Sequence, residues 1–247
     1  MALETVTGSR LLHTKYNLPK GGARLLPRHA ANLLLDEAGY RKLTVVTAPA
    51  GCGKTSAVRC WLTGSPLPAA WLSLDAGDND PLVFWRGFCA ALDTVVPGVV
   101  RDTDYVFMAP ELFRAKLHLG LMVDALLRGQ THFFFVIDDL HLITTPEIYE
   151  GLDYLISCMP EYMHLILISR VKPHLSVEKL AMKEELIRIG PAELRFQKDE
   201  IAGFYKARGF FLQTDEVDRI ESYTEGWAAA MVAVALSIQD EKAAGFP

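Results

Sequence analysis

The sequence has few cysteines, and none of them is spaced for a disulfide or a metal site. The four residues form no C-x-x-C pair and no Cys/His ligand pattern. They are Cys52, Cys60, Cys89 and Cys158. Disulfides belong to oxidising compartments, so unpaired thiols are typical of a reduced, cytoplasmic protein. The seven histidines likewise show no metal-ligand spacing.

Long apolar runs and runs of basic residues are also lacking. The longest apolar stretches, FFFVI and LILI, have the length of strands and are far too short to span a membrane. The N-terminal MALETVTGSRLLHTK contains no signal-peptide core. The net charge of −5 argues against a surface that grips a nucleic-acid backbone, because such binding needs clustered Lys and Arg. We therefore expect direct binding neither to membranes nor to nucleic acid.

What the sequence does contain is an alternation of apolar, strand-like runs with amphipathic, helix-like segments. The predicted strands are residues 43–48, 69–74, 132–138, 164–169 and 185–190. This alternation favours an α/β fold, in which helices cover both faces of a parallel sheet.

The strand pattern stops after Gly190, and three helix-like segments follow it. Thr214 is a good N-cap for the second of these helices. The sequence thus predicts an N-terminal approach segment (1–26), an α/β domain (27–190) and a small all-α subdomain (191–247).

A glycine-rich segment follows the first predicted strand. APAGCGKT matches the phosphate-binding pattern G-x-x-x-x-G-K-[ST] except that Ala48 replaces the first glycine. Glycines allow successive N–H groups to converge on an anion at a helix start. In such a loop the lysine reaches the β- and γ-phosphates, and the threonine hydroxyl completes a Mg²⁺ shell. The alternative is a plain glycine-rich turn with a surface lysine. The predicted nucleotide contacts are Ala50, Gly51, Cys52, Gly53, Lys54, Thr55 and Ser56.

Two carboxylates end the predicted strand HFFFVID. Asp138 fits the acidic element that holds Mg²⁺ in these nucleotide-binding proteins. Asp139 occupies the place where phosphate-loop proteins that hydrolyse their nucleotide often carry a glutamate, which orients the attacking water. An aspartate is shorter, so we expect its role as a base to be weaker or relayed by water. Without the glycine-rich loop upstream, the pair would fit helix capping equally well. His141 is the only histidine that we expect near this site.

Arg170 follows the next apolar run, LILIS. The strand 69–74 between the glycine-rich loop and the acidic strand implies the ASCE branch of P-loop NTPases, with strand order 5-1-4-3-2. Arg170 then emerges between Lys54 and Asp138, where it could sense the γ-phosphate or stabilise transition-state charge. A solvent-facing arginine is the alternative.

Six segments together resemble the N-terminal ATPase module of the MalT-like signal-transduction ATPases with numerous domains (STAND), from about residue 24 to about residue 237. They are LLPR, APAGCGKT, WLSLDAGDNDP, FVIDDLH, LISR and EGWAAAM. The resemblance implies ATP and ADP as ligands, with Mg²⁺. It also implies a repeat-built sensor, and often a DNA-binding domain, outside this chain. In such proteins ADP holds a resting form, whereas inducer and ATP permit self-association.

The resemblance assigns further residues by position. Arg28 would approach the nucleotide from the N-terminal side. Gly226 and Trp227 match a Gly-x-Pro that closes over the adenine, although Ala228 replaces the proline. Packing of the helical subdomain is the alternative role of Trp227.

The segment SLDAGDNDP carries three aspartates. Asp75, at the end of the second predicted strand, is a candidate carboxylate behind the Mg²⁺ ligands. Asp78 and Asp80 are predicted to cap the helix that begins PLVFWRGF.

The function predicted from these residues is that of a regulatory switch in a LuxR-type regulator, with slow ATP hydrolysis. A small-molecule or nucleotide kinase is the alternative enzyme, but such kinases need an arginine-rich lid. The segment after Arg170, VKPHLSVEKLAMKEE, has no arginine cluster. A DNA-remodelling or clamp-loading ATPase is disfavoured by the acidic balance.

Overall fold

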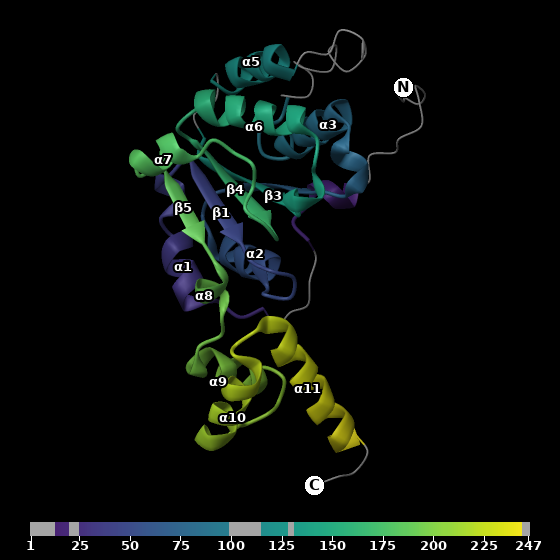
Figure 1. Cartoon of the computed structure of the whole chain (residues 1–247), viewed down its shortest axis with the longest axis vertical. Helices are drawn as coiled ribbons and strands as arrows, with labels where there is room; N and C mark the ends of the chain where they lie inside the picture. Colours follow the sequence, from purple (N-terminus) through teal and green to yellow (C-terminus); the bar gives the residue numbers. More distant parts are fainter. Residues whose placement is uncertain (1–12, 20–24, 99–114, 128–130, 244–247) are drawn as a thin grey trace.

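A five-stranded parallel sheet forms the centre of the computed structural model, which describes residues 13–19, 25–98, 115–127 and 131–243 (Figure 1). The strands are β1 Leu43–Thr47, β2 Ala69–Ser73, β3 Phe133–Asp138, β4 Met163–Ser169 and β5 Leu186–Ile189. Their order is β2-β3-β4-β1-β5, which is the predicted 5-1-4-3-2 counted from the other edge. Every pair of neighbours is parallel. The predicted fold is confirmed.

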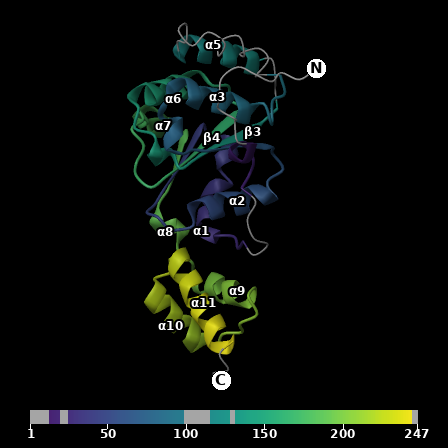
Figure 2. The same cartoon turned by 90° about the vertical axis from the view of Figure 1, so that its right-hand side faces the viewer.

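Helices cover both faces of the sheet (Figures 1 and 2). Alternate residues of β3 enter two separate cores: Phe133 and Phe135 face one of them, and Phe134 faces the other. One face carries α3 Pro81–Leu92, α5 Ala115–Leu126 and α6 Pro146–Cys158. The other carries α1 His29–Leu35, α2 Lys54–Gly64 and the short α8 Pro191–Leu194. Because strands β3 and β4 are buried along their whole length, they read as continuous apolar runs in the sequence.

Short elements connect these layers. They are the 3₁₀ helices η1 His13–Tyr16, η2 Ala38–Tyr40, η3 Ala76–Asn79 and η5 Leu140–Leu142, and the α-helix α7 Glu178–Met182. Helix η1 lies beside β2 at the edge of the sheet. The ammonium of Lys15 is 2.6 Å from Asp75 Oδ2 and 3.0 Å from Asp78 Oδ2, and Tyr16 is buried. The described part of the predicted approach segment therefore packs on the α/β domain.

The helical subdomain has a hydrophobic core of its own. It consists of α9 Lys198–Lys206, α10 Thr214–Thr224 and α11 Ala228–Ala243, which lie below the sheet and its helices in Figure 1. Phe204, Tyr205 and Met231 are among the residues buried between these helices. The prediction that Thr214 caps α10 is wrong. Gln213 is the N-cap, and its backbone N–H donates to Glu216 Oε2 at 2.7 Å.

No helix in the described part of the chain is long and apolar enough to cross a bilayer. All four cysteines are free thiols.

Candidate functional site

The phosphate loop connects β1 to α2 and has the backbone that anion binding requires. Gly51 and Gly53 have φ values of 81° and 79°, in the left-handed region that favours glycine. Gly53 is the residue immediately before α2, whose first N–H groups have no partner within the helix. Ala48, in place of the first glycine of the pattern, is buried in the core on the α1/α2 side of the sheet and has no positive φ. An alanine therefore fits there.

Lys54 is folded back onto this loop. Its ammonium donates to the carbonyl oxygens of Ala48 at 2.7 Å and Pro49 at 2.9 Å. The residue is buried, and this burial lowers the pKa of its side chain. A phosphate at the loop would offer the ammonium a charged acceptor in exchange for two neutral carbonyls.

The remaining loop residues lie around this lysine. Ala50, Gly51 and Ser56 are exposed, whereas Cys52 is buried in the same core as Ala48. Cys52 thus serves packing, and the exposed residues line the outer surface of the loop.

The two predicted Mg²⁺ ligands are neighbours. The Thr55 hydroxyl donates to Asp138 Oδ1 at 3.2 Å, and the same oxygen accepts the Asp139 N–H at 2.9 Å. Asp138 is buried, and this burial, together with the charge of Asp139, raises the pKa of its carboxyl group to about 6. A carboxylate and a hydroxyl at the end of the phosphate loop are oxygen donors that suit Mg²⁺, which usually keeps waters and phosphates as its other ligands.

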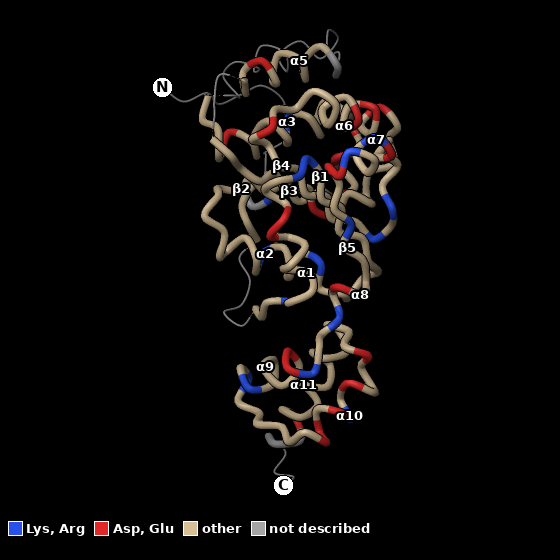
Figure 3. The backbone as a smooth tube through the Cα atoms, turned by 90° about the vertical axis from the view of Figure 1, so that its left-hand side faces the viewer, with Lys and Arg blue, Asp and Glu red and all other residues tan. Residues whose placement is uncertain are grey.

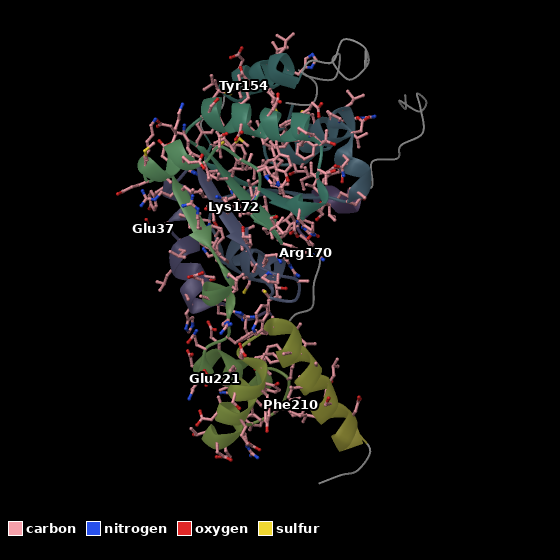
Figure 4. The ribbon with its side chains drawn as sticks, in the orientation of Figure 1. Glu37, Tyr154, Arg170, Lys172, Phe210 and Glu221 are labelled. Carbon is pink, nitrogen blue, oxygen red and sulfur yellow. The ribbon has the colours of Figure 1, made fainter. Side chains whose placement is uncertain are left out.

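Asp139 and Arg170 both lie close enough to His141 for their charges to act on it. Asp139 has a left-handed backbone (φ 59°), and its Oδ1 is 3.8 Å from His141 Nδ1. Burial lowers the pKa of His141; the charge of Asp139 opposes this shift, and the charges of Arg170 and Lys54 add to it. Arg170 is exposed directly beyond β4, on the side that faces the helical subdomain (Figure 4). These residues therefore share one electrostatic environment.

Arg28 lies where the phosphate loop meets the helical subdomain. Its guanidinium carbon is 3.0 Å from the centroid of the Phe196 ring, a cation–π contact. Its Nη2 is 3.9 Å from the place that a β-carbon on Gly53 would occupy. Arg28 is buried, which lowers its pKa to about 10, and its Nε has no hydrogen-bond partner among the described residues. Arg28 thus lies beside the phosphate loop, and its contact with the nucleotide stays a prediction.

Helix α11 begins on the phosphate loop itself. The Ala229 N–H donates to the Gly51 carbonyl at 2.9 Å. A β-carbon on Gly51 would lie 2.8 Å from Ala229 Cβ, and one on Gly53 would lie 3.1 Å from Ala228 Cβ. Only small residues on both sides permit so close an approach. The sequence reading missed this contact, although the alanine run after Trp227 was a signal for it.

Gly226 and Trp227 shape the start of α11. Gly226 has φ 71°, and its carbonyl accepts the Phe196 N–H at 2.9 Å, so the bend before the helix requires a glycine. Trp227 is partly buried against the core that contains α1 and α2. The Arg195 guanidinium carbon is 5.8 Å from its ring centroid. The structure thus gives Trp227 a packing role.

The three aspartates after β2 serve local structure. Asp80 caps α3 by accepting the N–H groups of Leu82 and Val83 at 2.8 and 3.1 Å, as predicted. Asp78 instead accepts the Asp75 N–H at 2.7 Å, so the prediction that it caps α3 is wrong. Asp75 accepts the Gly77 N–H and pairs with the Lys15 ammonium, whose hydrogen bond lowers its pKa.

Acidic and basic residues are scattered over both domains in the described part of the chain (Figure 3). No group of three or more His, Cys, Asp or Glu side chains there is arranged to hold a metal ion by itself. The charged residues near the phosphate loop include Arg28, Lys54, Asp138, Asp139, Arg170 and Arg195.

Known proteins match this chain in sequence and in fold. No family model matches it. The transcriptional regulator MalT of Serratia proteamaculans is 32% identical over 205 residues, which are 83% of this chain and 22% of that protein. The MalT of Cronobacter sakazakii is 28% identical over 95% of this chain and 26% of that protein. The chain spans about a quarter of the length of these relatives.

A solved structure shares the fold. It is a STAND protein with a tetratricopeptide repeat sensor from Pyrococcus horikoshii, with a TM-score of 0.57 and 16% identity. The match covers 80% of this chain and 28% of that one. The chain is therefore a homologue of the MalT regulators over most of its length and has the P-loop ATPase fold of STAND proteins.

Proposed function

We propose that this chain is the ATP/ADP-binding switch module of a larger, MalT-like LuxR-type regulator in the cytoplasm. Slow Mg²⁺-dependent ATP hydrolysis would control its self-association. Sensor and DNA-binding domains would lie outside the chain. The contact between α11 and the phosphate loop carries the proposal. It joins the nucleotide site to a separate domain, and such a contact is what a switch needs to pass on the state of its nucleotide.

The residues around the loop support nucleotide binding. The exposed face of the loop, the N-terminus of α2 and Lys54 form an anion site. Thr55 and Asp138 would hold Mg²⁺, which would offset phosphate charge when bound. Arg28, beside Gly53, and Arg170, whose charge acts on Lys54, add positive charge to the site.

The contact supports a switch in a second way. Ala229 and Gly51 leave no room for a further atom between them, so a shift of the loop on binding phosphate must move α11 or break the hydrogen bond. A ligand can shift a conformational equilibrium only through its different affinity for the two states. A difference in loop conformation between the ATP complex and the ADP complex would therefore change the position of the helical subdomain.

Denaturing the purified protein and identifying the released nucleotide tests the proposal. We expect tightly held ADP and negligible steady-state turnover. Fast turnover that requires a second substrate would indicate a kinase instead.

A Lys54→Ala variant tests the phosphate site directly. We expect it to fold but to lose tight binding of ADP and ATP, by at least about tenfold, because a charged hydrogen bond is worth roughly 1.5–3 kcal/mol. Titration with each nucleotide measures the change. Lys206→Ala, which removes an exposed lysine of α9, is the matched control. Equal affinities for wild type and Lys54→Ala would overturn the assignment of the loop.

A further inference from the structure

His141 is a partly buried histidine whose two ring nitrogens are covered and make no hydrogen bond to the described residues. Its side chain is 12% exposed. A neutral imidazole has one donor and one acceptor, and leaving both unpaired in the interior is destabilising. A leucine would fill a similar volume without that penalty. Packing therefore does not account for a histidine here.

The surroundings of His141 are those of the phosphate site. It belongs to η5, which follows β3 and the two aspartates directly. Its ring is close enough to Asp139, Arg170 and Lys54 for the charge of each to affect it. The left-handed backbone of Asp139 brings that carboxylate to 3.8 Å from Nδ1. Catalytic hydrogen bonds are often this long before substrate binds and shorten in the complex.

The ionised carboxylate determines which ring nitrogen carries the proton. Asp139 can only accept a hydrogen bond, so Nδ1 must be the donor when the two groups meet. The lone pair of the neutral ring is then on Nε2. This nitrogen is covered in the structure, so the attacking water would have to enter beside it together with the nucleotide. The pair thus has the form of a carboxylate that orients an imidazole, whose far nitrogen receives a proton.

We propose that Asp139 and His141 act as one unit that orients the water attacking the terminal phosphate of bound ATP. The imidazole extends the reach of an aspartate that is too short to hold this water alone. The inference rests on the proposed function, and it adds a residue that the nucleotide-binding pattern does not include.

The reaction balances without another reactant. The water oxygen bonds to the γ-phosphorus while the bond from that phosphorus to the β–γ bridging oxygen breaks, and its electron pair leaves with ADP. One proton of the water passes to Nε2 and from there to inorganic phosphate or solvent. Asp139 stays ionised and stabilises the imidazolium that forms.

Replacing His141 with leucine tests this role. General-base catalysis is typically worth 10²–10⁴-fold, so we expect His141→Leu to slow the conversion of bound ATP to ADP at least about a hundredfold. Its affinity for ATP and ADP should change less than about threefold, and its melting temperature should not fall. Single-turnover assays over hours measure the conversion even where turnover is slow. Lys206→Ala, at an exposed position of α9 in the helical subdomain, is again the control.

Two further variants separate catalysis from a structural effect. His141→Gln places an amide near the position of Nε2 and should recover part of the rate. Asp139→Ala combined with His141→Leu should be no slower than the slower single variant, because residues that act as a unit are not additive. Additive losses would show that the two side chains act separately and would overturn the proposal.

The remaining outcomes are also decisive. Wild type that fails to bind nucleotide would overturn the proposed function itself. Wild type that binds ATP but never converts it would overturn the role of His141 and the hydrolytic part of the proposed function, and would leave only nucleotide binding. A His141→Leu variant that hydrolyses ATP at the wild-type rate, or that loses affinity for ADP, would overturn only the role of His141.

Discussion

Asp138 combines two properties, burial and a like-charged neighbour, that together destabilise its ionised form. It is 4% exposed, and its nearest ionisable neighbour, Asp139, carries the same charge. The Thr55 hydroxyl and the Asp139 N–H are its hydrogen-bond donors, and neither carries a positive charge. A divalent cation at this position would remove the penalty, so the carboxylate is poised for metal rather than for packing.

We expect Asp138→Asn to stabilise the nucleotide-free protein above about pH 6. The folded state raises the pKa of this carboxyl group from its ordinary 3.8 to about 6. Between these values the folded state binds the proton more tightly than the unfolded chain, so the stability of wild type falls as the pH rises. The loss is complete above about pH 6 and corresponds to up to about 3 kcal/mol. The asparagine keeps the hydrogen-bond acceptor and removes the charge.

Thermal unfolding from pH 4 to pH 8 measures this difference. The two proteins should have similar stabilities near pH 4, and the variant should be more stable at pH 8. Added Mg²⁺ and ATP should reverse the order at pH 8, because only wild type gains the metal. A gap between the two proteins that is independent of pH would show that the carboxylate is not buried as a charge.

The short sequence patterns predicted which residues form the centre of the candidate site, but not which hydrogen bonds and ion pairs these residues make. Lys54, Thr55 and Asp138 were predictable because phosphate and Mg²⁺ chemistry demands them at fixed positions after strands. The hydrogen bonds from the Lys54 ammonium to the carbonyl oxygens of Ala48 and Pro49 depend on the geometry of the loop, which a residue pattern does not specify. The pairing of Asp75 with Lys15 was equally hidden, because the two residues are distant in the sequence and their approach depends on the whole fold.

At the level of elements, the start of α11 is the part that joins the two domains. Ala228 and Ala229 bring the helix within van der Waals distance of Gly51 and Gly53. Close packing of this kind does not tolerate extra methyl groups without movement of the backbone.

We expect Ala228→Leu to push α11 away from the phosphate loop and to lower the affinity for both ADP and ATP several-fold. The α/β domain should remain folded, because Ala228 does not belong to either core of the sheet. Titration with nucleotide and limited proteolysis of the helical subdomain measure the two effects. Ala233→Leu, on an exposed part of the same helix, should change neither. Unchanged affinity in Ala228→Leu would mean that the contact does not communicate with the site.

The elements themselves followed from the sequence where hydrophobic burial dominates. All five strands and their order agree with the prediction, because buried parallel strands need continuous apolar runs and the ASCE pattern determines where each one lies. Helix ends were less predictable. Gln213 rather than Thr214 precedes α10, since the Glu216 side chain satisfies the backbone N–H there.

For the whole molecule, the question is what makes ATP and ADP different signals. Arg170 is exposed between the two domains and pairs with no carboxylate among the described residues, so a γ-phosphate would be a new partner for it (Figure 4).

We expect Arg170→Ala to narrow the difference between ATP and ADP affinity by about ten- to a hundredfold, with ADP affinity changed less than about threefold. In sedimentation experiments, wild type should self-associate with ATP and not with ADP. The variant should show the same degree of self-association with either nucleotide. Equal losses of affinity for the two nucleotides would mean that Arg170 only supports the pocket.

The separate core of the helical subdomain has a consequence for how the protein melts. Two cores lie on the faces of the sheet and a third lies among α9, α10 and α11, with Trp227 packed against the sheet side. A domain with its own core can unfold by itself, so heat absorption without nucleotide should occur in two steps. A ligand held by both domains adds its binding free energy only while both are folded. With bound nucleotide, the two unfolding transitions should therefore merge into one. The cooperativity of unfolding in calorimetry then measures how closely the two domains are joined.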